Sequence, residues 1–302
     1  MTTFLAILAL VAVTPFLREA ARPRMPRRDA PGQFADLPQG CVHYRWLGAK
    51  DGPVAVCVHG LTTPSPVWQA IAETLGDMGY RVLVYDLYGR GYSGCPGGAQ
   101  DVAFFTRQLS DLLADQKVTG DITLFGYSMG GIIAPGFAAE NPRMIRRIVL
   151  LAPAGIGHDL GPASRLMAKT GLLGTWAMLA LYGRSMRRAL EAERSQASGV
   201  PGIVDMQIAQ LRYRGYLPAV LSSLRGALDA DTEAVHRKLA EAGLPVLVIW
   251  AGKDDVIPIK GRDTLAEWNA AAVQEVVPEA GHALPYSHDA DVARLLGHHL
   301  AR

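Results

Sequence analysis

Cysteine is scarce in this sequence, whose 302 residues include only Cys41, Cys57 and Cys95. These three residues show neither the spacing of metal ligands nor a disulfide framework, and an odd count is slightly more typical of a reducing compartment. The sequence also has no cluster of His, Cys and carboxylate residues with zinc spacing. We therefore expect neither a metal nor an organic cofactor.

The chain also lacks a large excess of charge, with 30 basic and 28 acidic residues. Arginines gather only in residues 18–28, and the rest of the chain is nearly neutral. Because a nucleic-acid-binding domain needs a basic surface, no nucleic-acid partner is expected. Nearly half of the residues are apolar, which is typical of a globular protein with a large core.

The run TTFLAILALVAVTPFL at residues 2–17 is apolar on every side, unlike an amphipathic surface helix. It is shorter than the roughly 20 residues of a spanning helix. Arginines follow the run instead of preceding it, which favours a membrane anchor over a secretory signal and predicts a cytoplasmic position for the following chain. One alternative is a cleaved signal of a secreted protein. The other is a hydrophobic helix docked on the domain or on a second subunit of a soluble cytoplasmic protein. Residues 1–32 are predicted to be an anchor and a basic, proline-containing linker.

From residue 33, short apolar runs typical of buried strands alternate with stretches of helical periodicity. FADL and CVHYRWLG, separated by PQG, predict an antiparallel hairpin, and the later alternation predicts a parallel sheet. Residues 156–243 are mostly helical in pattern. We therefore predict an α/β core formed by residues 33–155 and 244–302, with a helical cap formed by residues 156–243.

The sequence GYSMGG places Ser128 in a G-x-S-x-G motif between a predicted strand and a predicted helix. Such a turn exposes a serine hydroxyl at the edge of a sheet, where it can act as a nucleophile. A serine nucleophile needs a base, and the base needs an orienting acid. His282 follows the last predicted strand, while Asp254 and Asp255 follow the one before it. The three types of residue occur in the order serine, aspartate, histidine.

With these motifs, with His59–Gly60 and with YDLYGRGYS, the chain resembles the α/β-hydrolase superfamily over roughly residues 33–300. The resemblance implies an eight-stranded, mostly parallel sheet with the helical cap inserted after the sixth strand. It implies that Ser128 attacks, that His282 transfers the proton and that an aspartate holds the imidazole. It also implies that the backbone N–H groups of Leu61 and Met129 bind the oxyanion, and that His59 has a structural role.

Family members usually carry the acid three positions after a small residue at the strand end and four before a proline. Counting back from Pro258, or forward from Ala251, gives Asp254, whereas counting from Gly252 gives Asp255. We favour Asp254.

A competing interpretation comes from GRGYSG at residues 89–94, which matches the G-x-G-x-x-G pattern of dinucleotide-binding sites. That pattern requires the glycines to open a helix. The residues that follow, CPGGAQD, are too rich in glycine and proline to begin one. We therefore reject a nucleotide-binding oxidoreductase.

The predicted cap contains an apolar stretch that is either the core of the cap or the lining of an acyl pocket; it comprises Leu172, Leu173, Trp176, Met178, Leu179, Leu181 and Tyr182. Together with the N-terminal run, this favours a membrane-associated serine esterase or lipase that acts on small esters with hydrophobic, medium-chain or lipid-like groups. The alternatives are a lactonase, thioesterase, carbon–carbon hydrolase or perhydrolase with the same residues, or a non-catalytic binding protein of the same fold.

Overall fold

The computed structural model describes residues 2–28 and 30–300 of the chain. Parts of two predicted segments lie outside the described residues: residue 1 and Asp29 of segment 1–32, and the last two residues of segment 244–302.

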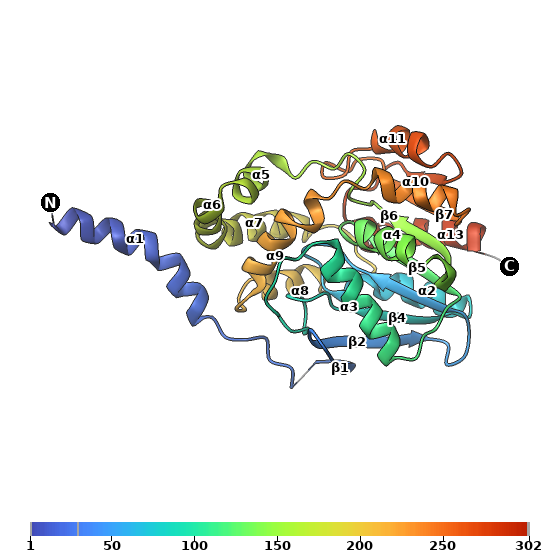
Figure 1. Cartoon of the computed structure of the whole chain (residues 1–302), viewed down its shortest axis with the longest axis horizontal. Coiled ribbons are helices and arrows are strands. Elements are labelled where there is room, and N and C mark those ends of the chain that lie inside the picture. Colours follow the sequence, from blue (N-terminus) through green and yellow to red (C-terminus); the bar gives the residue numbers. More distant parts are fainter. Residues whose placement is uncertain (1, 29, 301–302) are drawn as a thin grey trace.

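The centre of the molecule is one eight-stranded sheet with the strand order β1-β2-β4-β3-β5-β6-β7-β8 (Figure 1). Its strands are β1 (Gln33–Leu37), β2 (Gly40–Gly48), β3 (Val54–Val58), β4 (Arg81–Tyr85), β5 (Ile122–Tyr127), β6 (Ile145–Leu151), β7 (Val246–Ala251) and β8 (Val273–Val277). β2 pairs antiparallel with β1 and β4, and all other pairs are parallel. The predicted hairpin and the predicted parallel sheet are both confirmed.

Helices cover both faces of the sheet. One face carries α3 (Val102–Asp115), α4 (Gly130–Glu140), α10 (Glu233–Glu241) and α11 (Gly261–Trp268), and the other carries α2 (Gln69–Asp77), α12 (Leu284–Ser287) and α13 (Asp289–Leu300). This double coverage explains why β5 and β7 are buried along their whole length and are nearly continuous apolar runs.

A helical cap lies between β6 and β7. It contains α5 (Gly161–Lys169), α6 (Gly171–Ala177), a π-helical segment (Met178–Tyr182), α7 (Gly183–Glu193), α8 (Ile203–Gln210) and α9 (Tyr216–Arg225). Within the predicted cap range 156–243, α10 instead contacts α4 and α11, so it belongs with the layer that covers the sheet. Its amphipathic pattern is the same in either position, because a cap helix and a sheet-covering helix each bury one face.

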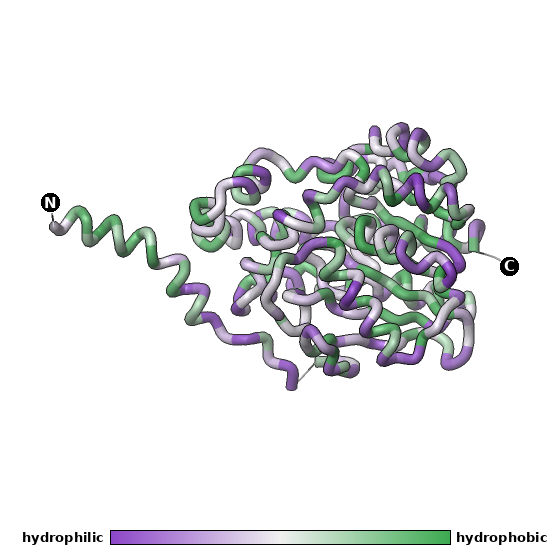
Figure 2. Tube along the Cα trace, viewed as in Figure 1, coloured by the Kyte–Doolittle hydropathy of each residue, from purple (hydrophilic) through white to green (hydrophobic). Residues whose placement is uncertain are grey.

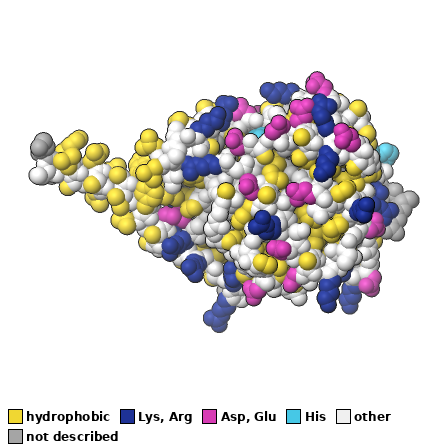
Figure 3. All heavy atoms as spheres, in the orientation of Figure 1, with side chains coloured by type: hydrophobic (Ala, Val, Ile, Leu, Met, Phe, Trp, Pro, Cys, Tyr) yellow, Lys and Arg dark blue, Asp and Glu magenta, His cyan; other side chains and the backbone are white. Residues whose placement is uncertain are grey.

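The N-terminal helix α1 (Thr2–Ala21) points away from the body of the molecule (Figure 1). It has 20 residues and therefore continues past the apolar run through Arg18 and Glu19. Its first part is hydrophobic and its end is hydrophilic (Figure 2), and hydrophobic side chains cover its exposed surface (Figure 3). Among the described residues it is the one helix long and apolar enough to cross a membrane, by length and composition.

Candidate active site

Ser128 occupies a sharp turn between β5 and α4. Its φ of 54° is unusual for a residue with a side chain and marks a strained backbone. A Cβ at Gly126 would lie 2.3 Å from the carbonyl oxygen of Gly130, and a Cβ at Gly130 would lie 2.1 Å from the carbonyl oxygen of Val58. The two glycines of the motif are therefore required by close backbone packing, which holds the serine turn against the end of β3.

Ser128, His282 and Asp254 form one hydrogen-bonded chain. Ser128 Oγ lies 2.9 Å from His282 Nε2, and His282 Nδ1 lies 2.8 Å from Asp254 Oδ2. The other carboxylate oxygen, Asp254 Oδ1, accepts hydrogen bonds of 2.8 Å from the backbone N–H groups of Val256 and Ile257. The structure thus brings together three residues that are up to 154 positions apart in the sequence.

The two aspartates after β7 have different surroundings. Asp254 is buried and bonded to His282, whereas the neighbouring Asp255 is exposed. A buried carboxylate with both oxygens occupied is held in one position, which is what an orienting acid requires. The geometry places Asp254, the favoured residue, in contact with the imidazole.

The two predicted oxyanion donors lie in the turns that meet at Ser128. Met129 directly follows the serine, and Leu61 follows Gly60, whose hypothetical Cβ would lie 3.0 Å from Ser128 Cβ. Within the described part of the chain, neither the Leu61 nor the Met129 backbone N–H donates a hydrogen bond to another protein group. Both groups therefore lack an acceptor within the described chain, and their role as oxyanion donors stays a prediction.

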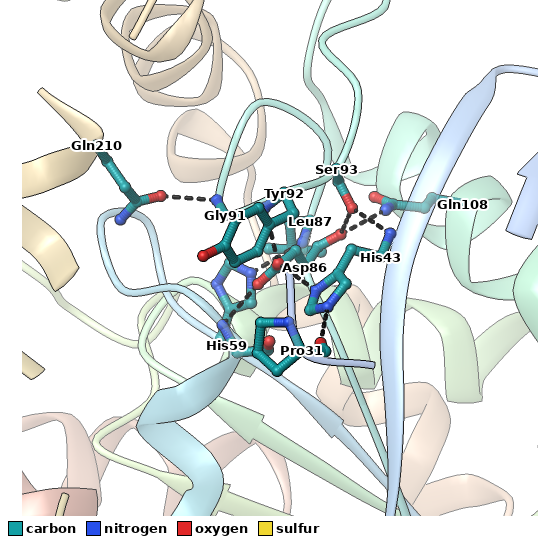
Figure 4. Close-up of polar contacts among 11 residues, drawn as sticks. Pro31, His43, His59, Asp86, Leu87, Gly91, Tyr92, Ser93, Gln108 and Gln210 are labelled. Atoms are coloured by element: carbon teal, nitrogen blue, oxygen red, sulfur yellow. Dashed lines mark hydrogen bonds and ion pairs between the residues drawn. The ribbon is translucent and has the colours of Figure 1, made fainter. Parts of the chain in front are cut away.

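His59 joins the loop after β3 to the loop after β4 (Figure 4). Its Nε2 accepts a hydrogen bond of 2.8 Å from the Leu87 backbone N–H, so the proton lies on Nδ1, which donates to the carbonyl oxygen of Gly60 at 2.8 Å. Burial lowers the pKa of His59 to about 4. The ring is neutral and fully engaged, in agreement with the predicted structural role.

A buried acidic residue that sequence reasoning left without a role, Asp86, lies beside His59 (Figure 4). Asp86 Oδ1 accepts a hydrogen bond of 2.8 Å from the Ser65 backbone N–H, and Oδ2 accepts one of 2.9 Å from the Tyr92 backbone N–H. Asp86 Oδ2 also lies 2.8 Å from Nδ1 of His43. The loop formed by the motif YDLYGRGYS is therefore held together by hydrogen bonds to its own aspartate.

Residues 89–100 form turns and irregular structure, as predicted, and open no helix for a dinucleotide.

A cavity of about 400 Å³ opens above Ser128 and His282. Its apolar lining comes from both the core and the cap, and the cap side includes Leu160, Tyr182, Met186, Leu190, Leu224 and Leu228. Of the apolar cap stretch proposed from the sequence, only Tyr182 reaches this cavity. Met178 is instead fully buried in the core, while Leu172, Leu173 and Leu181 are exposed. The interpretation of that stretch as an acyl pocket is therefore wrong, because its composition alone could not show which way each helix face points.

The charge of the cavity is also informative. Its described lining contains no Lys or Arg side chain, and it contains Asp159 and Glu193. Burial raises the pKa of Glu193, which accepts a hydrogen bond of 3.4 Å from Tyr286 Oη.

A larger cavity of about 850 Å³, between the linker and the loop after β4, is lined by neither Ser128 nor His282. Among the described residues no group of His, Cys, Asp and Glu could hold a metal ion.

The chain belongs to the alpha/beta hydrolase family, whose family model matches residues 55–295. It is 30% identical over 229 residues to a 2-hydroxymuconate semialdehyde hydrolase from Pseudomonas sp. (strain CF600), covering 73% of this chain and 76% of that protein. It is 26% identical to a pimeloyl-[acyl-carrier protein] methyl ester esterase from Chromobacterium violaceum, covering 82% and 94% of the two chains. An esterase from Exiguobacterium antarcticum has the same fold, with a TM-score of 0.74 at 18% identity over 90% of this chain and all of that one.

Proposed function

We propose that the protein is a serine hydrolase that cleaves neutral carboxylic esters with hydrophobic acyl or alcohol groups. Ser128 Oγ attacks the ester carbonyl carbon while His282 Nε2 takes its proton, and Asp254 holds the imidazole through Nδ1. The alcohol leaves with the proton from His282. Water, deprotonated by His282, then releases the acid from the acyl-enzyme. The N–H groups of Leu61 and Met129 bind the oxyanion, each contributing about 3 kcal/mol in the transition state.

The observation that carries this proposal is the hydrogen-bonded chain of Ser128, His282 and Asp254 at the floor of an apolar cavity. A binding protein would not need all three residues in this arrangement. The lack of Lys and Arg in the described lining favours a neutral substrate, since a substrate carboxylate would be desolvated there without a cationic partner. Lactones, thioesters and carbon–carbon bonds are the alternative targets, since the same three types of residue can cleave them.

The domain division and the location belong to the same proposal. Residues 33–155 and 244–302, together with α10, form the catalytic core, the helices between β6 and α10 form the cap, and residues 1–32 form an anchor and linker. The exposed apolar surface of α1 and the arginines that follow it support attachment to the cytoplasmic face of a membrane.

A chain-length series of p-nitrophenyl esters, from acetate to palmitate, tests the function on wild type and Ser128→Ala with detergent held constant. We expect a maximum at medium or long chains that disappears in the variant. Labelling by a fluorophosphonate probe should likewise require Ser128. A folded wild-type protein that takes no label would refute the serine mechanism. Label without ester turnover would keep the nucleophile and move the substrate to lactones, thioesters or carbon–carbon bonds.

A further inference from the structure

The cap carries a group of large apolar side chains that are exposed. Leu172 and Leu173 on α6 are 74% and 76% exposed, and Leu181 in the π-helical segment is 56% exposed. These three residues, which we call the cap patch, lie on α6 and the π-helical segment, both of which contact α1. Hydrophobic side chains continue from the projecting helix onto the neighbouring part of the body (Figure 3). The exposed surface is thus larger than α1 alone.

Three hydrogen bonds fasten α1 and its linker to the cap. Trp176 Nε1 on α6 donates to the carbonyl oxygen of Val11 at 3.2 Å. Near the helix end, the Gly215 backbone N–H donates to Glu19 Oε1 at 2.7 Å, and the Arg214 backbone N–H donates to the carbonyl oxygen of Pro23 at 2.8 Å. Because Glu19 is buried at this contact, the direction of α1 relative to the cap patch is set by the fold.

The charges at the base of α1 indicate what covers this surface. Arg18, Arg22 and Arg24 follow the apolar part of the helix, and Lys and Arg side chains gather at its base (Figure 3). A surface that is apolar at its tip and cationic at its base matches a bilayer leaflet, whose hydrocarbon lies below a layer of anionic headgroups.

We propose that α1 and the cap patch form one membrane-docking surface that inserts into the near leaflet of an anionic phospholipid membrane. Residues 2–10 of α1 lie beyond the contact at Val11 and rise by about 1.5 Å each, so they extend about 13 Å past α6. This length is less than half of the roughly 30 Å hydrocarbon core of a bilayer. With α6 at the interface, residues 2–10 therefore lie within the near leaflet.

The same arrangement brings the cavity close to the bilayer. Leu181 belongs to the cap patch, and the next residue, Tyr182, lines the cavity above Ser128. An apolar ester dissolved in the leaflet therefore has a short path to the site. This consequence rests on the proposed function, whereas the docking surface itself rests on the proposed anchor.

Fluorescence quenching of the full chain tests the position of α6. Wild type and Trp176→Phe are bound to vesicles of phosphatidylcholine with a minor fraction of phosphatidylglycerol, in which the phosphatidylcholine acyl chains carry bromine. The other four tryptophans, at positions 46, 68, 250 and 268, lie outside the cap. We expect marked quenching in wild type and little in Trp176→Phe.

Vesicle flotation tests the cap patch by comparing the double variant Leu172→Glu/Leu173→Glu with Val273→Glu, a substitution at a 46% exposed residue of the edge strand β8, outside the cap. We expect the double variant to lose at least roughly tenfold in vesicle partitioning, since two leucines no longer enter hydrocarbon. The control variant should partition as wild type does. Turnover of a short, water-soluble ester should be the same in all three proteins.

The other outcomes distinguish the two proposals. Wild type that stays off the vesicles overturns both the anchor and the docking surface. If wild type binds vesicles but Trp176 is not quenched and the double variant partitions as wild type does, only the docking-surface proposal is overturned. If wild type is a dimer in vesicle-free buffer and the double substitution converts it to monomers, a second copy of the chain covers the cap patch, and the docking-surface proposal is again overturned. If wild type and both variants all fail to turn over the short ester, only the proposed function is contradicted.

Discussion

Tyr127 Oη donates a hydrogen bond of 2.7 Å to the backbone carbonyl oxygen of His282. Tyr127 is the last residue of β5 and directly precedes Ser128, so one element of the sheet holds both the nucleophile and the loop of the base. The two rings also lie close together, with centroids 5.4 Å apart. Burial raises the pKa of Tyr127 well above its ordinary value, which keeps the hydroxyl protonated as a donor.

Replacing Tyr127 by Phe should lower kcat by roughly tenfold with little change in KM, because the loss of one buried hydrogen bond costs about 1 kcal/mol and loosens the His282 loop. The rate of fluorophosphonate labelling should fall in parallel. Tyr85→Phe is the matched control, since Tyr85 is buried and its hydroxyl has no hydrogen-bond partner in the described chain. An unchanged kcat in Tyr127→Phe would show that His282 is held without this bond.

Asp254→Asn and Asp255→Asn form a second pair with opposite expectations. Asp254→Asn removes the charge that faces His282 Nδ1 and should lower kcat by roughly 10³- to 10⁴-fold. Asp255→Asn alters an exposed side chain and should leave kcat within about twofold of wild type. Steady-state kinetics of both variants and wild type on one ester measures the two changes in kcat. Equal losses in both variants would mean that the carboxylate opposite His282 is not the acid that matters.

Much of the core was predictable because its signals are local. Strand runs and the serine motif occupy contiguous residues, so periodicity placed Ser128 and His282 at strand ends without knowledge of any contact. The choice between Asp254 and Asp255 depends on a neighbour 28 positions away, and only the folded chain settles which carboxylate faces the imidazole. The apolar residues of α6 could not be assigned by composition, because leucine has the same pattern on a pocket wall and on a membrane-facing surface.

The pairing of His43 with Asp86 is a further feature that no local pattern indicates, since 43 positions separate the residues. His43 Nδ1 lies 2.8 Å from Asp86 Oδ2, and Nε2 contacts the carbonyl oxygen of Pro31, so both ring nitrogens face acceptors (Figure 4). Burial opposes the charge on His43, but the hydrogen bond and the charge of Asp86 raise its pKa overall. Burial likewise opposes the charge on Asp86, yet its bonds with His43 lower the pKa of Asp86. The result is a buried ion pair that ties the linker to the sheet.

The signs of these shifts define a pH window for stability. The contribution of His43 is complete below its unfolded pKa of about 6.5 and is lost as the pH rises through the raised folded value. The contribution of Asp86 is present above about pH 4 and is lost as the pH falls through its lowered folded value. The pair should therefore stabilise the fold most between about pH 4 and 6.5.

His43→Gln should lower the free energy of unfolding by about 3–5 kcal/mol near pH 6, because it leaves a buried carboxylate without its partner. The difference from wild type should shrink between pH 6 and pH 9 as the pH rises through the raised pKa of His43, because wild type then loses that charge itself. Denaturant unfolding at both pH values measures this, with the exposed residue His298 replaced by Gln as the control. A difference that stays constant with pH would mean that His43 is neutral in the folded protein.

His236 leads to the opposite pH dependence. It is fully buried, neither ring nitrogen has a hydrogen-bond partner among the described residues, and its ring stacks on Trp268 with centroids 6.1 Å apart. Burial lowers the pKa of His236 to about 4. Between about pH 6.5 and 4 the unfolded chain binds a proton that the folded protein does not, so stability falls with falling pH. At 1.36 kcal/mol per pH unit, His236 accounts for about 3 kcal/mol of acid destabilisation over that range.

His236→Phe should keep the stacking on Trp268 and remove two polar atoms that burial leaves unpaired. We expect the variant to be at least as stable as wild type at pH 7, by up to about 2 kcal/mol, and to lose less stability on acidification. His59, whose pKa burial also lowers to about 4, remains in the variant, so part of the acid dependence should persist. Unfolding free energies at pH 7 and pH 5 measure both effects. If both proteins lose the same stability between pH 7 and pH 5, His236 takes up its proton without global unfolding. The α10–α11 contact would then open to solvent in the folded protein.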